Sequence, residues 1–349
     1  MPAAEAAPVA PRPIEDSELP ALFSLFAGHS SVLIACSGGP DSTALMLLAA
    51  RWAALCAGAP MLHVATVDHG LRPEAAQEAQ GVAGHARALG LPHAILSWHG
   101  PHPKSGIQEA ARDARYALLA ARAREIGGTA IVTAHTQDDQ AETIVMRLAR
   151  GSGLAGLAGM APRSRRHGLA VLRPFLTVPK ARLVATLEAG GIGFVRDPSN
   201  SDAKFTRVRL RALMPVLAGE GLDAEGLARL ARRLARAEAA LEQAADAAFA
   251  VLAPPGAPRA PVRVARATFF ALPEEIALRV LHRAIDVVGD EGPVELAKLE
   301  RLLGRLLGAE AEGHSICGTL AGARVHLAGG HLEVARALPR RPRKPGNSA

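Results

Sequence analysis

The chain of 349 residues has few cysteines and few aromatic residues. Its three cysteines, Cys36, Cys56 and Cys317, form no Cys-x-x-Cys pair, which excludes the usual spacing of a zinc or iron–sulfur site and a disulfide framework. Aromatic residues make up 3% of the chain. That scarcity argues against the aromatic platforms on which many RNA-binding proteins stack single-stranded bases.

Long apolar runs are missing as well. The most apolar window, residues 44–62, is interrupted by Arg51, Gly58 and Pro60, which excludes a membrane span there. The N-terminus is rich in proline and alanine and lacks the cationic start and apolar stretch of a signal peptide. We therefore expect a cytoplasmic protein.

The charge of the chain is strongly positive, with a formal net charge of +7 and a sequence pI near 10.0. A basic surface favours an anionic partner, and nucleic acid is the leading candidate. A composition biased toward arginine and alanine would give the same balance without any such partner. Charge alone does not decide between these two interpretations.

Short apolar runs alternate with helical patterns through the first half of the chain. The pattern predicts strands over 31–36, 62–67, 94–98, 130–134 and 169–173, and helices over 43–55, 74–89, 108–126, 138–150 and 180–189. Such alternation is typical of an α/β fold with a doubly wound, mostly parallel sheet. Ligands of these folds bind at the carboxyl ends of the strands.

The domain organisation follows from changes in this pattern. We predict a disordered leader over 1–20, a catalytic domain over 21–218 with a mobile loop at 151–168, and a boundary at the glycines of 219–221. The second, smaller domain, 219–338, is predicted to be a mainly helical α+β unit. It comprises helices over 223–252, 273–288 and 293–307, and two or three strands within 314–335, whereas a helix over 208–217 ends the catalytic domain. Residues 339–349 form a basic, disordered tail.

A glycine-rich turn follows the first predicted strand and opens a helix. It reads Ser37, Gly38, Gly39, Pro40, Asp41, Ser42. Backbone N–H groups at such a helix start bind phosphate, and the glycines allow close approach. No Walker motif occurs in the chain. Because Asp41 would repel a polyphosphate, we infer a Mg²⁺ ion between them. The structural alternative is a turn capped by Asp41 and Ser42.

The turn resembles the loop of the PP-loop (N-type) ATP pyrophosphatases, and the wider sequence resembles the tRNA(Ile)-lysidine synthetase family. The segments that carry this resemblance are VDHGLR (67–72), QEAARDARY (108–116), TAHTQDDQAET (133–143), RLARGSGLAGLAGM (147–160) and RDPSNSD (196–202). Thr136 and Val208 depart from the family pattern, which often has His or Asn at the first position and Asn at the second.

The resemblance implies an ATP-dependent ligase. Such an enzyme adenylates the C2 carbonyl oxygen of the wobble cytidine in CAU-anticodon isoleucine tRNA and joins L-lysine to it, releasing AMP and pyrophosphate. ATP with Mg²⁺, L-lysine and tRNA are the implied ligands. The oligomeric state stays open, a homodimer included.

An acidic cluster follows the fourth predicted strand. Asp138 and Glu142 share one helix face, Asp139 lies beside them, and His135 precedes them. We assign Asp138 and Asp139 to catalysis, and Asp138, Glu142 and His135 to lysine binding. The alternatives are an acidic first turn of an exposed helix and a structural histidine.

Two further groups are candidates at the same edge. Arg112 resembles a catalytic residue of the family, and Arg115 lies on the same helix face, where a solvated role is equally expected. Asp68 and His69 follow the second predicted strand, so we place them at the nucleotide's adenosine end. His69 is equally compatible with an ordinary loop position.

Basic residues outside the catalytic loops are candidates for tRNA contact. Arg207, Arg209 and Arg211 form one group, and Arg232 and Arg233 lie on one face of the long helix with Arg229 and Arg236. A solvated helix face is the alternative for each group.

Other enzymes that use the same loop remain in view. A tRNA thiolase is the main alternative, although sulfur-transfer relatives often need the paired cysteines that this chain lacks. A catalytically inactive RNA-binding module is a third interpretation. The presence of Asp41, Arg112, Asp138 and Asp139 argues against it.

Overall fold

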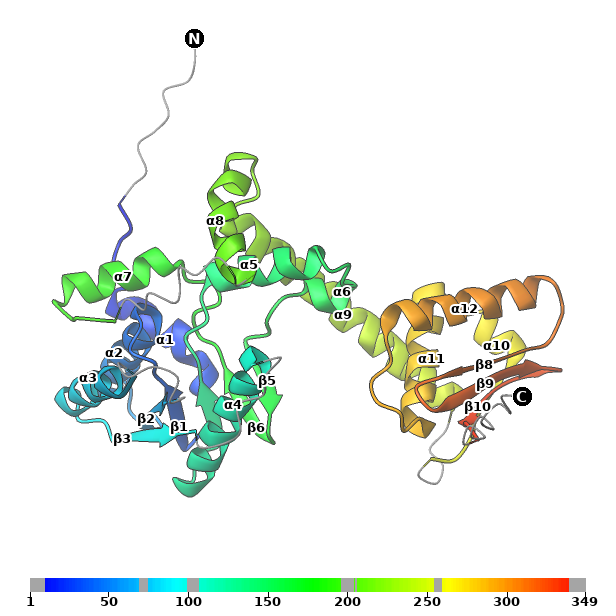
Figure 1. Ribbon diagram of the computed structural model, residues 1–349, viewed down its shortest axis with the longest axis horizontal. Helices are drawn as coiled ribbons and strands as arrows, with labels where there is room; N and C mark the ends of the chain where they lie inside the picture. Colours follow the sequence, from blue (N-terminus) through cyan, green and yellow to red (C-terminus); the bar gives the residue numbers. More distant parts are fainter. Residues whose placement is uncertain are drawn as a thin grey trace, which may run out of the picture. The chain divides into compact units, whose positions relative to one another are not determined.

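The computed structural model describes residues 10–68, 75–98, 107–195, 204, 206–253 and 259–338. The chain divides into two compact units (Figure 1). The first comprises residues 1–152 and 156–233, and the second comprises 153–155 and 234–349. The division falls inside one helix, after Arg233 rather than at 219–221, so the extent of the functional domains stays a prediction.

A six-stranded sheet forms the centre of the first unit, with strand order β3-β2-β1-β4-β6-β5. The parallel strands are β1 (Ser31–Ala35), β2 (Met61–Asp68), β3 (His93–Ser97), β4 (Ala130–Val132) and β6 (Leu169–Leu172). At the edge, β5 (Arg163–Arg166) runs antiparallel to β6. The predicted doubly wound, mostly parallel sheet is therefore confirmed.

Helices cover both faces of this sheet because successive side chains of a strand point to opposite sides. In β1, Val32 and Ile34 enter a core with α1 (Leu19–Leu22), α2 (Pro40–Leu55), α3 (Ala75–Ala88) and α7 (Lys180–Ala189). Leu33, between them, packs on the other face against Leu119 and Ala123 of α4 (Ile107–Glu125). Strand order reverses between β1 and β4, where α/β folds bind their ligands.

A third group of helices packs on α5 (Gln137–Leu148), which follows β4. Ala141 and Ile144 of α5 contact Leu227 and Ala231 at the start of α9 (Ala224–Leu252). Met214 of α8 (Thr206–Gly219) packs against the same cluster. Helix α5, which carries the predicted acidic cluster, is thus packed against α8 and the start of α9.

The prediction of a disordered leader is wrong for residues 10–20. Ile14 and Leu19 are buried in the core of the first unit, and 3-10 turns over Asp16–Glu18 and Phe23–Phe26 flank α1. The Ile14 N–H donates to Thr186 Oγ1 at 2.9 Å. Pro/Ala-rich composition suggested disorder, but this contact reaches across 172 positions of sequence and could not be read locally. Residues 1–9 and the predicted tail at 339–349 lie outside the described residues.

The prediction of a loop without regular structure over 151–168 is also wrong. The segment contains α6 (Leu154–Leu157) and the edge strand β5. Side chains of α5 hold the backbone around and after α6: Arg147 donates to the Gly156 and Gly159 carbonyls at 2.6 and 2.9 Å. Gln140 bonds both backbone groups of Met160. The side chains that fix this segment therefore belong to α5 and not to the glycine-rich segment itself.

The second unit combines helices with an antiparallel sheet of order β7-β10-β9-β8. Its strands are β7 (Val262–Ala265), β8 (Ile316–Leu320), β9 (Ala323–Ala328) and β10 (His331–Arg336), and its helices include α10 (Arg266–Phe270), α11 (Glu274–Val288) and α12 (Leu296–Ala311). The sequence did not predict β7 and α10, which come after a proline-rich stretch. No helix in the described ranges, the 29-residue α9 included, is long and apolar enough to cross a membrane.

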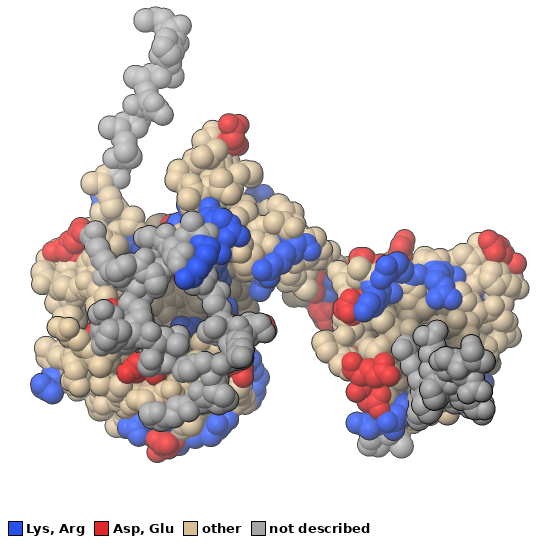
Figure 2. All heavy atoms as spheres, in the orientation of Figure 1, with Lys and Arg blue, Asp and Glu red and all other residues tan. Residues whose placement is uncertain are grey.

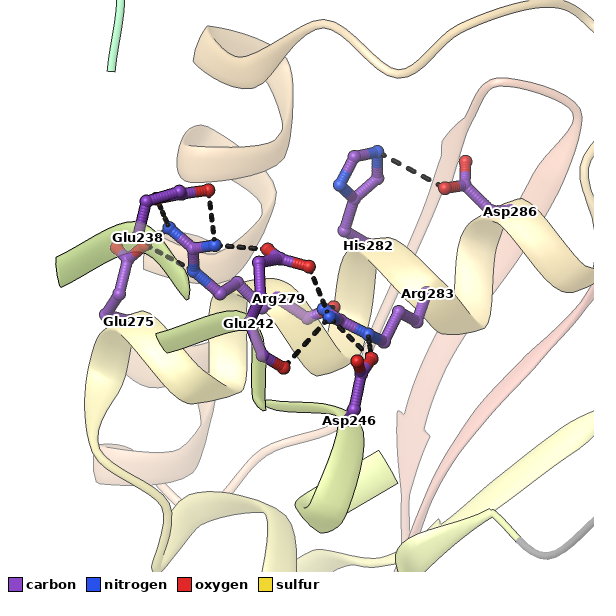
Figure 3. A network of polar contacts seen from close by, with 8 residues as sticks. All are labelled: Glu238, Glu242, Asp246, Glu275, Arg279, His282, Arg283 and Asp286. Carbon is purple, nitrogen blue, oxygen red and sulfur yellow. Dashed lines mark hydrogen bonds and ion pairs between the residues drawn. The ribbon is translucent and has the colours of Figure 1, made fainter. Parts of the chain in front are cut away.

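Two arginines of α11 fix the later part of α9 within the second unit (Figure 3). Arg279 bonds Glu238, Glu242 and Glu275, and Arg283 bonds Glu242 and Asp246. Arginine forks that share several carboxylates hold a fixed geometry better than single ion pairs. This end of α9 is therefore tied to α11 by charge as well as by apolar packing.

The burial of Ile14 can be tested by truncating its side chain. We expect Ile14→Ala to lower the free energy of unfolding by about 2–4 kcal/mol, because it leaves a cavity in a packed core. Leu55→Ala is the control, since Leu55 is 66% exposed and its loss should cost under about 1 kcal/mol. Urea unfolding followed by circular dichroism measures both. Equally small effects of both substitutions on the free energy of unfolding would contradict the burial of Ile14 and support a disordered leader.

Candidate active site

The turn after β1 is held by its own side chains. Ser42 Oγ accepts from the Ser37 N–H at 3.2 Å and donates to the Gly39 carbonyl at 3.1 Å. Gly38 has φ +85°, and a Cβ there would lie 3.2 Å from Val82 Cγ2, so glycine is required. Pro40 then opens α2, where its missing N–H costs no hydrogen bond. A rigid helix N-terminus with an exposed Ser37 results, suited to an anion.

Asp41 lies in the first turn of α2 and is largely buried. Its Oδ2 accepts from Lys180 Nζ at 2.9 Å. Its Oδ1 is buried and has no hydrogen-bond partner within the described part of the chain. Burial raises the pKa of the Asp41 carboxyl, and the charge and hydrogen bond of Lys180 oppose that rise.

Lys180 was not among the predicted site residues. It is the first residue of α7, and its backbone N–H donates to Asp138 Oδ2 at 2.7 Å. One residue thus joins Asp41 of the phosphate loop to Asp138 of the acidic cluster. A signal existed in the sequence, because Lys180 opens the helix after a predicted strand, as the phosphate loop and the acidic cluster do.

The start of α5 shows what Thr136, which departs from the family pattern, does in this chain. Thr136 caps the helix: its Oγ1 accepts from the Asp139 N–H at 3.3 Å, and Asp139 Oδ2 accepts from the Thr136 N–H at 2.9 Å. This reciprocal cap satisfies two backbone donors. Asp139 Oδ2 therefore takes part in the cap, whereas Asp139 Oδ1 does not.

Glu142 and Arg211, predicted to bind different ligands, are paired with each other. The Glu142 side chain is 2% exposed, and its Oε1 accepts from Arg211 Nε at 2.7 Å. Glu142 Oε2 is buried without a partner among the described residues. Burial raises the pKa of Glu142, while Arg211 opposes that rise. Arg207 lies alongside and donates to Thr143 Oγ1 at 3.3 Å.

His135 precedes the cap and is uncharged at neutral pH. Burial is the main cause that lowers its pKa to about 4, and Arg173, Arg115 and Arg207 add to the effect. Asp139 opposes it. The ring Nδ1 is 2.9 Å from Thr133 Oγ1. A neutral imidazole here can make hydrogen bonds but is a weak base.

Several arginines lie close enough to Arg112 to interact with it electrostatically. Desolvation lowers the pKa of the Arg112 guanidinium, and the positive charges of Arg207, Arg115 and Arg166 lower it further. Arg115 and Arg166 lie 5.3 and 4.7 Å from the centre of the Tyr116 ring. Guanidinium groups this close repel one another, and a bound anion would relieve that repulsion.

The remaining predicted residues lie at different places. Asp68 ends β2, and His69 lies outside the described residues. A cavity of about 440 Å³ adjoins Gly38 and is lined by Val82 and His85 of α3 and by Phe194.

The predicted tRNA contacts are on α8 and α9. Arg209 donates to the Lys204 carbonyl at 2.9 Å and to Thr206 Oγ1 at 3.2 Å. Arg232 and Arg233 are exposed on α9. In Figure 2, basic side chains collect over the area where α5, α8 and the start of α9 lie in Figure 1.

A Mg²⁺ ion fits this site only together with phosphate. Among the described residues, no group of three His, Cys, Asp or Glu side chains could hold a metal ion. The unpartnered Oδ1 of Asp41 is nevertheless a suitable ligand. Mg²⁺ is commonly held by one or two carboxylates together with substrate phosphates.

Comparison with known proteins gives the family. A model of the PP-loop domain matches residues 13–217. A tRNA(Ile)-lysidine synthase of Bradyrhizobium sp. (strain BTAi1 / ATCC BAA-1182) is 54% identical over 346 residues, covering 95% of this chain and 97% of the relative. The chain belongs to the tRNA(Ile)-lysidine synthase family. A member from Methylobacterium nodulans (strain LMG 21967 / CNCM I-2342 / ORS 2060) is also 54% identical, over 95% and 98% of the two chains.

Membership of the tRNA(Ile)-lysidine synthase family confirms the predicted ATP-using, tRNA-modifying ligase. Among solved structures, the U34-tRNA thiolase NcsA from Methanococcus maripaludis has a TM-score of 0.54 at 15% identity, covering 63% of this chain and 77% of its own. At that identity the likeness shows the fold alone. The comparison with the thiolase therefore supports a shared fold and gives no support for thiolase activity in this chain.

The pKa of His135 predicts a pH dependence of stability. Its folded pKa is about 4 against 6.5 for an unperturbed histidine, so the unfolded chain binds the proton first as pH falls. For this reason the free energy of unfolding should fall by up to about 3 kcal/mol between pH 6.5 and 4. We expect His135→Gln to flatten that slope in urea unfolding at each pH. His331→Gln, at an exposed position, is the control, and a wild-type slope in His135→Gln would contradict the assignment.

Proposed function

We propose that this chain adenylates the C2 oxygen of the wobble cytidine in CAU-anticodon isoleucine tRNA with ATP and joins L-lysine to that carbon. The observation that carries the proposal is the identity of 54% with tRNA(Ile)-lysidine synthases over nearly the whole chain. A cytoplasmic location follows from such a substrate. The number of subunits, a homodimer included, stays open.

The phosphates of ATP would bind at the start of α2. Ser37, Gly38, Gly39, Pro40, Asp41 and Ser42 supply the loop, and Asp68 with His69 would lie toward the adenosine. Asp41 would hold Mg²⁺, which neutralises part of the phosphate charge. Arg112 lies in a region of positive charge suited to the developing phosphate charge of the adenylated intermediate.

Lysine addition needs an uncharged amine. The lysine ε-amine has a reference pKa near 10.4, so releasing its proton at pH 7 costs about 4–5 kcal/mol. We assign Asp138, Glu142 and His135 to lysine binding and Asp138 and Asp139 to catalysis. The buried, unpartnered Oε2 of Glu142 supports this, because an ammonium group would satisfy it. His135, with a pKa of about 4, serves as a hydrogen-bonding group rather than as the base.

The reaction is tested by the release of AMP from ATP and Mg²⁺ with isoleucine tRNA, with and without lysine, followed by mass analysis of the nucleosides. AMP release that depends on lysine, with lysine attached to cytidine, is the expected result. ATP turnover without lysine incorporation would favour another PP-loop tRNA modification, such as thiolation.

Asp41→Asn tests the phosphate loop in that assay. We expect AMP release to fall by about 100-fold or more, because the variant loses charge next to the phosphates. Binding of tRNA should stay near the wild-type value, since Asp41 is assigned to the nucleotide and not to the tRNA backbone. Asp286→Asn, an exposed change in the second unit, is the control. Equal loss of both functions would contradict the role of Asp41.

The basic groups of α8 and α9 are proposed to contact tRNA: Arg207, Arg209, Arg211, Arg232 and Arg233. Arg211 also neutralises Glu142, so it is a poor test of tRNA contact. Arg232 and Arg233 are exposed and lie on a helix start held by α5.

Reversing their charge should weaken tRNA binding and its salt dependence. We expect Arg232→Glu with Arg233→Glu to reduce the slope of log affinity against log salt by about 1–2, as two phosphate contacts are lost. Arg51→Glu with Arg122→Glu carries the same change of net charge on other, partly exposed side chains of the first unit. The same slope in both double variants would assign Arg232 and Arg233 to a solvated face.

A further inference from the structure

Lys180 joins α7 to α2 through Asp41, and its position next to the phosphate loop also points to a role in ligand binding. Its Nζ lies 2.9 Å from Asp41 Oδ2, in the first turn of the helix that the phosphate loop opens. The side chain is 38% exposed, whereas that of Asp41 is 23% exposed. Lys180 is therefore the more exposed partner of the pair and lies next to the phosphate loop.

Three helix N-termini meet at this residue. Lys180 opens α7, its ammonium group bonds Asp41 of α2, and its N–H bonds Asp138 of α5. Helix N-termini carry partial positive charge and attract anions. The first turns of α2 and α5 also carry carboxylates, Asp41 in one and Asp138 and Asp139 in the other, which repel a polyphosphate. The Lys180 ammonium, on a flexible side chain next to Asp41, offsets part of that repulsion.

The choice of lysine is itself informative. Five of the 40 basic residues in the chain are lysines, and the rest are arginines. Arginine would pair with Asp41 through a rigid, planar fork. Lysine instead offers a compact ammonium on a flexible stem, which can leave one oxygen and bond another. In a chain so rich in arginine, lysine at this position favours a group that changes partners.

We propose that Lys180 is a catalytic residue that leaves Asp41 and binds the β- and γ-phosphate oxygens of ATP. The proposal rests on the proposed adenylation reaction. There the bond between the α-phosphorus and its bridging oxygen to the β-phosphorus breaks, and the cytidine C2 oxygen forms the new bond to the α-phosphorus. Pyrophosphate leaves with the electron pair, and Lys180 stabilises the charge that grows on it.

The same contact has a purely structural interpretation, in which Lys180 neutralises Asp41 and pins α7 to α2. That interpretation predicts lower stability for any uncharged replacement and a similar effect on every nucleotide. The proposal predicts an effect on the outer phosphates alone. AMP, which lacks them, separates the two interpretations.

The test is calorimetric binding of pyrophosphate and of AMP to the full chain in the presence of Mg²⁺. We expect Lys180→Met to weaken pyrophosphate binding by about 10- to 100-fold, the range for losing a charge-assisted hydrogen bond. AMP affinity should stay within about 2-fold of wild type. Lys180→Arg should recover part of the loss, because it keeps the charge. Lys298→Met, the same change at a half-exposed lysine of the second unit, should have no effect.

Equal weakening of AMP and pyrophosphate binding, or unchanged pyrophosphate affinity with a lower melting temperature, would overturn the proposal. Lys180→Gln, which removes the charge but stays polar, gives the same comparison if Lys180→Met does not fold. The outcome is separate from that of the proposed function. A chain that binds pyrophosphate through Lys180 but forms no lysine–cytidine product would refute the reaction and keep this role.

Discussion

The contact between Asp41 and Lys180 is the interaction on which the arrangement of the site depends. It joins the start of α2 to the start of α7, and the backbone of Lys180 joins both to Asp138 of α5. These helices follow β1, β6 and β4, strands that lie side by side at the centre and one flank of the sheet. Parallel strands bring the helix starts to one edge, but two short hydrogen bonds fix how they face each other. These bonds also place the Lys180 ammonium beside the carboxylate in the first turn of α2.

The site leaves several buried polar atoms unsatisfied, and these atoms indicate what it binds. Asp41 Oδ1, Glu142 Oε2 and Arg173 Nε are buried and lack hydrogen-bond partners in the described part of the chain. Such atoms are rare in folded proteins because each costs free energy. Two of them are carboxylate oxygens, which a cation would satisfy. The third is Arg173 Nε, whose guanidinium donates through Nη1 to the Ala161 carbonyl and Ser164 Oγ. The two carboxylate oxygens therefore support the cation-binding roles proposed for Asp41 and Glu142.

The sequence predicted the fold well where the signal is periodic and local. Apolar runs and helical spacing located every parallel strand of the sheet, and the loop from Ser37 to Ser42 stands where the pattern predicts. The errors are at long-range contacts. Thr186 fixes Ile14, and Gln140 fixes Met160, so two segments that look disordered by composition are ordered. Lys180 opens a predicted helix after a predicted strand, but its partners Asp41 and Asp138 are 139 and 42 positions away and could not be read from the sequence. Pairing of Glu142 with Arg211, 69 positions apart, was equally invisible.

The phosphate loop has no lysine of its own, and the cation proposed to serve it, Lys180, comes from another helix. In a Walker loop the lysine follows the glycines directly and belongs to the loop alone. Here the lysine belongs to α7, and its backbone is held by a carboxylate of the cluster assigned to the amine substrate. A shift of Asp138 on binding an ammonium group would act on Lys180, the residue proposed to bind the phosphates. Conversely, nucleotide that draws Lys180 from Asp41 would change the charge felt by Asp138, since Asp41 and the acidic cluster interact electrostatically. Two ligands that never touch the same side chain can in this way influence each other through a single residue.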